Sequence, residues 1–318
     1  MSTCQHFLET RQPWIYFGAI AVAAALALAV PGTDALEPAI NPALAIMLFL
    51  TFLQLPLSAL GQALRELRFF ATLLVVNFVA VPMLVALLLP WVPDEPMVRL
   101  GVLLVLLCPC IDYVVTFSQL GRADARLLLA ATPALLVAQM LLLPVYLAVF
   151  LGESAAGLVQ RGPFVQAFVW LIAVPWVLAL LCQRWAARSA NAAHVMGVLA
   201  LLPVPATALV LGIVVLAVLP QWGAAGGQAL RVLPAYAAFA VAAPLLGWAV
   251  ARLARLPVEA SRAVAFSAAT RNSLVVLPLA LAVPGAVPLL PAIIVMQTLV
   301  ELVAELVYVR VLARAGAS

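Results

Sequence analysis

Four ionisable side chains interrupt long apolar stretches of this sequence. They are Asp112, Arg271, Glu301 and Glu305. Because a charge at the centre of a membrane-spanning helix costs about 2.5–3.5 kcal/mol on insertion, such residues usually serve a function. Asp112, Arg271 and Glu301 each lie about eight residues from the cytoplasmic end of a segment predicted below, which places all three at one level about 12 Å deep.

We therefore predict that Asp112 and Glu301 flank Arg271 and share its charge where the fourth and ninth segments cross. Two roles fit this arrangement. The charges move a substrate or a proton, or they form a static ion pair that locks the two halves together. Glu305 lies one turn nearer the cytoplasm, where a long side chain can snorkel to the interface.

A second set of candidates surrounds Cys108-Pro109-Cys110. Proline removes a backbone donor and kinks a helix, and an unwound stretch is tolerated at membrane depth where it lines a cavity. A thiol at such a break is a soft ligand for thiophilic ions, although two cysteines in a helix can equally be packing residues. The predicted substrate-binding residues are Cys108, Cys110, Thr116, Asn272 and Ser273.

The composition of the chain indicates that lipid, rather than water, surrounds these segments. Of the 318 residues, 67% are hydrophobic and 9% are charged, whereas an ordinary soluble domain has about 25% charged residues. The bilayer must therefore surround most of the chain. Every positive charge is an arginine, which favours orientation by loop charge over nucleic-acid binding. The sequence has no Walker lysine, Ser/His/Asp set or metal-ligand cluster, so we expect no ATP-driven pump, enzyme, cofactor or resident metal.

Apolar stretches of about 20 residues, enough to cross a bilayer core of about 30 Å, predict an all-α membrane protein with about ten transmembrane helices. The first stretch is longer than the apolar core of a signal peptide, so we interpret it as a helix. The segments are 14–31, 41–60, 69–91, 97–120, 125–151, 164–185, 194–219, 230–251, 263–284 and 288–309.

Arginines near the segment ends predict the orientation. Twelve lie on one face, whereas only Arg99, Arg161 and Arg231 lie on the other. The positive-inside rule then places both termini in the cytoplasm, in a multi-pass protein of the cell membrane. The expected partners are a small solute and membrane lipid, and the sequence leaves the oligomeric state open.

The two halves of the chain resemble each other weakly. In each half, a helix with a polar cluster precedes a long apolar helix. The two stretches are CPCIDYVVTFSQLGRADARLLLAATPALLVAQMLLLPVY and SAATRNSLVVLPLALAVPGAVPLLPAIIVMQTLVELVAELVY. Because each half has five segments, the second must enter the membrane from the opposite side. We predict two inverted five-helix repeats, residues 1–157 and 158–318, with crossed, discontinuous fourth and ninth helices.

At the two polar clusters the sequence resembles the superfamily of bile acid:sodium symporters and arsenite permeases, with the arsenite-permease branch the closer. PCIDYVVTFSQLGRAD is similar to the arsenite-permease stretch that carries a functional cysteine, and Cys110 matches that cysteine. FSAATRNSLVVLPLALAVPG is similar to the segment Phe-Thr-Ala-Ala-Gly-Asn-Asn-Phe-Glu, with Asn272 on the second Asn. The resemblance implies ten helices in a panel domain and a core domain.

The sequence departs from both branches at informative positions. The acidic residue of the arsenite-permease segment falls on Leu274, and the first Asn falls on Arg271. The Glu and Gln that bind sodium in the bile acid branch fall on Ser267 and Arg271. An arginine there would repel sodium, and Asp112 replaces a small residue of both branches. Proton coupling, or none, is therefore favoured over sodium coupling.

The sequence thus predicts a secondary transporter that exports arsenite or antimonite in exchange for protons. Cys110 would contact the metalloid transiently, Asp112 and Glu301 would respond to protons, and Arg271 would be their counter-charge. One alternative is an organic-anion carrier in which Arg271 binds a carboxylate. An alternative of a different class is a membrane sensor or scaffold that does not transport.

Overall fold

The computed structural model describes residues 3–54, 66–152, 161–221 and 223–316. Within these ranges the chain is helical, without a β-strand. Eight of the helices there are long and apolar enough to cross a membrane, as judged by length and composition. The end of the predicted segment 41–60 and the predicted boundary at 157/158 lie outside the described residues.

The chain forms two compact units, and each takes residues from both halves of the sequence. The first unit comprises Met1–Gln54, Val159–Gly226 and Leu277–Ala292, and the second comprises Leu55–Leu158, Gly227–Val276 and Ile293–Ser318. The compact units therefore differ from the predicted repeats 1–157 and 158–318, whose inverted relation stays a prediction. The first, sixth and seventh predicted segments and residues 41–54 of the second belong to the first unit.

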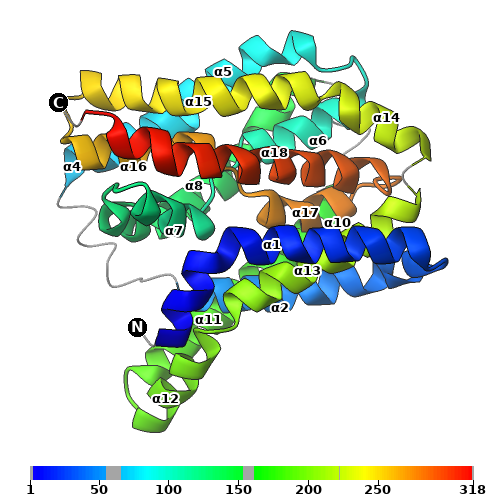
Figure 1. Cartoon of the computed structure of the whole chain (residues 1–318), viewed down its shortest axis with the longest axis horizontal. Helices are drawn as coiled ribbons and strands as arrows, with labels where there is room; N and C mark the ends of the chain where they lie inside the picture. Colours follow the sequence, from blue (N-terminus) through cyan, green and yellow to red (C-terminus); the bar gives the residue numbers. More distant parts are fainter. Residues whose placement is uncertain (1–2, 55–65, 153–160, 222, 317–318) are drawn as a thin grey trace. The chain divides into compact units, whose positions relative to one another are not determined.

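The first unit is a packed group of apolar helices. α1 packs along α13, and α2 contacts both α11 and α13 (Figure 1). The side chain of Thr33 donates to the carbonyl of Leu216 at 2.8 Å, which joins the turn before α2 to the end of α13. The bounds are α1 Thr3–Ala29, α2 Ile40–Leu53, α10 Arg161–Phe168, α11 Val174–Ala186, α12 Ala190–Leu199 and α13 Pro203–Val218.

The second unit contains the four ionisable residues predicted to lie inside the membrane, Asp112, Arg271, Glu301 and Glu305. Its helices are α4 Leu67–Val75, α5 Val81–Leu88, α6 Pro96–Leu106, α7 Tyr113–Leu120, α8 Ala125–Leu151, α15 Leu233–Leu253, α16 Val258–Ala269 and most of α18 Leu289–Val311. α14 Gly223–Arg231 leads into α15, and α17 Ser273–Leu281 follows α16. α4 and α5 are joined by a π-helical turn, Val76–Ala80, a feature that often marks functional sites.

α15 and α16 lie side by side in this unit (Figure 1). Gly247 of α15 makes the close approach possible, because a Cβ atom there would lie 2.7 Å from the Cβ of Ala268. The close packing fixes the C-terminal end of α16, where the second polar cluster begins.

Two of the predicted segments are broken helices. The predicted segment 97–120 consists of α6 and α7 with an unwound stretch between Leu106 and Tyr113. The predicted segment 263–284 consists of α16 and α17, separated by Thr270, Arg271 and Asn272. Proline lies in the first break only, so the second break depends on the contacts described next.

Candidate functional site

The two unwound stretches pair with each other. Cys110 N–H donates to the carbonyl of Thr270 at 3.0 Å, and Asn272 N–H donates to the carbonyl of Cys108 at 2.8 Å. Pro109 and Arg271 face each other in this short antiparallel bridge. Backbone groups that left their helices thus find partners inside the protein, as groups at membrane depth must. The fourth and ninth predicted segments thus meet through this backbone bridge.

Glu301 of α18 joins both breaks. Its Oε2 accepts from the Arg271 backbone N–H at 2.7 Å and from Gln297 Nε2 at 2.6 Å, while Oε1 lies 2.5 Å from Tyr113 Oη. Gln297 Oε1 in turn accepts from Ser273 Oγ at 2.8 Å. The Glu301 side chain is only 3% exposed. One carboxylate therefore ties the start of α7, the second break and α18 together.

The hydroxyl of Tyr113 has a choice of acceptor. Tyr113 Oη lies 2.5 Å from Glu301 Oε1 and 3.0 Å from the carbonyl oxygen of Arg271. One phenolic proton can serve only one of these oxygens. If Glu301 is protonated it can donate to Tyr113, and Tyr113 can then donate to the Arg271 carbonyl. The hydrogen bonds at the crossing thus depend on the protonation of Glu301.

Cys110 and Asp112 lie together in the first break. Cys110 Sγ donates to Asp112 Oδ1 at 2.9 Å, and the backbone N–H of Tyr113 donates to the same oxygen at 2.6 Å. Asp112 is the N-cap of α7, where the helix dipole stabilises a negative charge. Cys110 is buried and Asp112 is partly exposed. The first break therefore contains a buried thiol that is hydrogen-bonded to a carboxylate.

Arg271 is fully buried, and its guanidinium contacts neutral oxygens. Nη2 donates to Asn77 Oδ1 at 3.0 Å, to the Ala268 carbonyl at 2.7 Å and also to the Ser267 carbonyl, while Nη1 donates to the Leu106 carbonyl at 3.4 Å. The guanidinium also lies 5.7 Å from the centre of the Phe239 ring.

The expected ion pairs of Arg271 with Asp112 and Glu301 are not formed. Among the described residues the side-chain ion pair is that of Arg99 with Asp94, at 2.9 Å. The backbone N–H of Arg271 points toward Glu301. The side chain runs back along α16, and the last carbonyls of that helix accept hydrogen bonds from the guanidinium. The carboxylate of Asp112 instead accepts a backbone hydrogen bond as the N-cap of α7.

Glu305 does not snorkel, contrary to the expectation from its position along the chain. It is fully buried, and its Oε1 accepts from Thr270 Oγ1 at 2.5 Å. Its Oε2 has no hydrogen-bond partner among the described residues. Thr270 holds this acid at the crossing, one turn along α18 from Glu301.

The remaining predicted residues are divided between the crossing and its surroundings. Cys108 and Asn272 belong to the bridge through their backbones, and Ser273 reaches Glu301 through Gln297. The Asn272 amide nitrogen is buried and has no partner in the described part of the chain. Thr116 lies half-buried on α7, one turn beyond Asp112 and away from the bridge.

Sequence reasoning missed three contributors: Tyr113, Gln297 and Asn77. Gln297 precedes Glu301 by one helical turn, which is a readable signal. Asn77 is a polar residue in an apolar segment, and its amide nitrogen donates to Ser267 Oγ at 2.9 Å, which directs its oxygen toward Arg271. Tyr113 gave no signal beyond its place next to Asp112.

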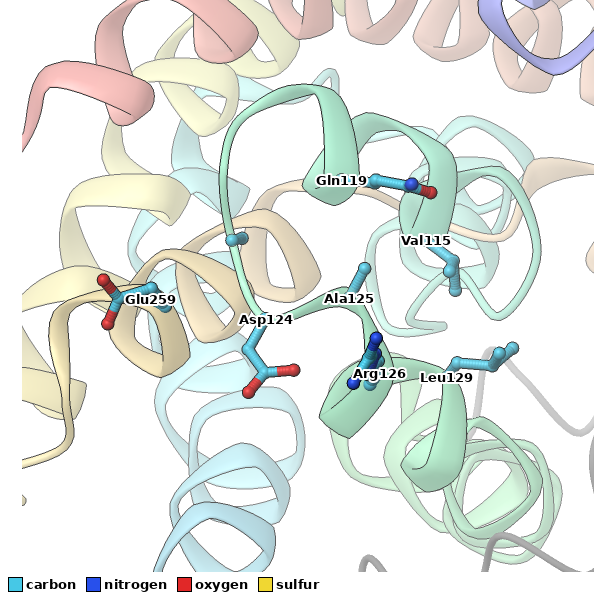
Figure 2. Close-up of a pocket in the computed structure, with 8 residues that line it drawn as sticks. Val115, Gln119, Asp124, Ala125, Arg126, Leu129 and Glu259 are labelled. Atoms are coloured by element: carbon cyan, nitrogen blue, oxygen red, sulfur yellow. The ribbon is translucent and has the colours of Figure 1, made fainter. Parts of the chain in front are cut away.

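An open cavity of about 450 Å³ lies where α7 turns into α8. Figure 2 shows Gln119 and Val115 of α7 on one side of it, with Arg126 and Leu129 of α8 and, farther off, Glu259 of α16. Asp112, Thr116 and Gln119 recur at helical spacing along α7 and are all at least partly exposed. A polar face of α7 thus runs from the cavity toward the first break.

A helical membrane protein with two broken helices paired at a buried polar cluster has the architecture of secondary transporters. Residues 41–221, more than half of the chain, match the Sodium Bile acid symporter family, and the chain belongs to that family. The match includes the first break and ends before the second. A search of curated proteins found no match.

The family name implies a sodium ion, which would need oxygen ligands at the crossing. The carbonyls of Leu106, Ser267 and Ala268 are suitable oxygen ligands, but the guanidinium of Arg271 already occupies them. A positive charge fixed at these oxygens opposes the binding of a second cation there. The residues present therefore do not fit sodium at this position.

Proposed function

We propose that the protein is a secondary transporter that exports arsenite or antimonite in exchange for protons. The observation that supports this most is the hydrogen bond from Cys110 Sγ to Asp112 at the paired breaks. Trivalent arsenic and antimony are soft and thiophilic, and a thiol is the soft ligand of the crossing. The family and the apolar helices support the broader class, a membrane transporter.

The chemistry at Cys110 would be an exchange of ligands without oxidation. The thiol sulfur forms a bond to the arsenic of arsenous acid, and one As–OH bond breaks. The thiol proton passes through Asp112 to the departing hydroxide, which leaves as water. Because a single thiol holds the metalloid, water can reverse the step, and release on the other side of the membrane stays possible.

Glu301 would couple the solute to protons. Its protonation lets Tyr113 switch its hydrogen bond from the carboxylate to the carbonyl of Arg271. This switch changes the hydrogen bonds that connect α18 to both breaks, and a transport cycle would rearrange the helices at this crossing. A proton bound at Glu301 would therefore favour one arrangement of the crossing, and its loss would favour the other.

The test is arsenite uptake into everted membrane vesicles under an imposed pH gradient. Cys110→Ser should abolish uptake, because serine offers no soft ligand. Cys182→Ser is the matched control, since Cys182 lies on α11 in the other unit, and it should transport normally. Wild-type uptake by the Cys110→Ser variant at equal expression would contradict the proposal.

The family match favours a second candidate, an organic-anion carrier. In that case Cys110→Ser would leave transport of the anion intact. The contacts of Arg271 weigh against its expected role as carboxylate ligand, because both of its terminal nitrogens already donate to protein oxygens. Uptake of a bile acid by the same vesicles separates the two candidates.

A further inference from the structure

The surroundings of Arg271 have the form of a binding site for a single positive charge. The guanidinium meets the last carbonyls of α16 and the last carbonyl of α6. The C-terminal end of a helix carries a partial negative charge, and the ends of interrupted helices in transporters bind cations. Two such ends converge here.

The oxygens around the guanidinium are neutral. They are Asn77 Oδ1 and the carbonyl oxygens of Leu106, Ser267 and Ala268. Within the described residues no carboxylate lies within ion-pair distance of Arg271. Four neutral oxygens suit a monovalent cation, since hard oxygen ligands prefer hard cations and no carboxylate oxygen belongs to the set.

Arg271 also differs from a free cation, which binds and dissociates. Its Cα is part of the bridge between the breaks, because Arg271 faces Pro109 and its backbone N–H binds Glu301. The charge therefore stays at the crossing in every cycle. A mobile ion at the same oxygens would have to bind and leave with the solute.

We propose that Arg271 is a built-in cation that fills the ion site at the ends of α6 and α16 and makes this transporter independent of sodium. The consequence for transport rests on the proposed function, whereas the occupation of the site does not. Removal of the side chain should expose Asn77 Oδ1 and the three carbonyls to a free cation. The variant Arg271→Ala should then bind sodium where the wild-type chain does not.

The experiment measures binding of radioactive sodium to the purified full-length protein in detergent, with no metalloid present. The wild type should show no saturable binding. Arg271→Ala should bind sodium saturably and retain at least about tenfold more sodium than the wild type at the same concentration. Methylguanidinium, which mimics the lost side chain, should compete with this binding. Adding Asn77→Ala to Arg271→Ala should weaken the acquired binding.

Arg262→Ala is the matched control. Arg262 is also buried and also donates to neutral carbonyls, but only to those of Arg122 and Ala315. Two oxygens are too few to replace the water shell of an ion, so this variant should acquire no sodium binding. Acquisition by both variants would mean that any lost arginine attracts sodium, and would overturn the assignment.

Two further results would overturn the proposal. One is saturable sodium binding by the wild type that equals binding by Arg271→Ala, and the other is a folded Arg271→Ala that binds no sodium. If Arg271→Ala does not fold, the wild type and Arg271→Lys are compared. Arg271→Lys keeps the charge and should bind no sodium, and saturable sodium binding by either protein would overturn the proposal. Failure of arsenite transport alone would contradict the proposed function and leave these binding results intact.

Discussion

The two breaks meet in one bridge but differ in what they hold. The first contains proline and a buried thiol, that of Cys110, hydrogen-bonded to the partly exposed carboxylate of Asp112 at the start of α7. The second contains no proline, and its Arg271 is buried among carbonyls. Under the proposed function the first break contacts the solute, and the second holds a permanent charge. Variants in the second should affect folding most, and variants in the first should affect transport most.

The largest expected effect on folding comes from Arg271→Leu. This change leaves Asn77 and three buried carbonyls without their donor, and we expect a loss of about 3 kcal/mol or more of stability. Size-exclusion chromatography and the thermal unfolding midpoint measure the effect. A fully folded but inactive Arg271→Leu protein would show instead that Arg271 serves transport and contributes little to structure.

Tyr113→Phe should have a smaller effect on folding and a specific effect on coupling. The ring stays, but Glu301 loses a hydrogen bond and the Arg271 carbonyl loses its alternative donor, at a cost of about 1–3 kcal/mol. We expect arsenite transport that responds less to an imposed pH gradient. An unchanged response at equal expression would exclude the tyrosine switch.

Asp112→Asn should separate capping from chemistry in the first break. Asparagine is as good an N-cap as aspartate, so the unfolding midpoint should stay nearly unchanged. The thiol of Cys110 loses its anionic acceptor, and arsenite transport should fall by about tenfold or more. Asp112→Ala, which also removes the cap, should lose a further ~1 kcal/mol of stability. Equal transport by wild type and Asp112→Asn would rule out proton transfer through Asp112.

The smallest effect on stability is expected at Gln119, on the polar face of α7. Gln119→Cys should be modified by a polar thiol reagent, because Gln119 is exposed at the cavity, and modification should block transport. Val114→Cys is the control, since Val114 is buried on the same helix and should not react. Transport that survives complete modification of Gln119→Cys would place the solute path elsewhere.

The sequence determined the class of the protein and the position of the breaks. Long apolar stretches specify membrane helices because the favourable free energy of transferring apolar side chains into lipid adds up residue by residue along one helix. Polar clusters at Cys108–Asp112 and Thr270–Ser273 marked the interruptions because each is costly in an otherwise apolar segment. The same reasoning selected Cys110, Asp112, Arg271 and Glu301, which the structure brings to one crossing.

Only the tertiary structure decided which of these groups bind each other. The bridge joins stretches about 160 residues apart, and it turns the N–H of Arg271, rather than its guanidinium, toward Glu301. Asn77 and Tyr113 became partners through the same packing. The direction of a side chain at an unwound residue depends on the backbone that pairs with it, and sequence spacing describes only regular helices.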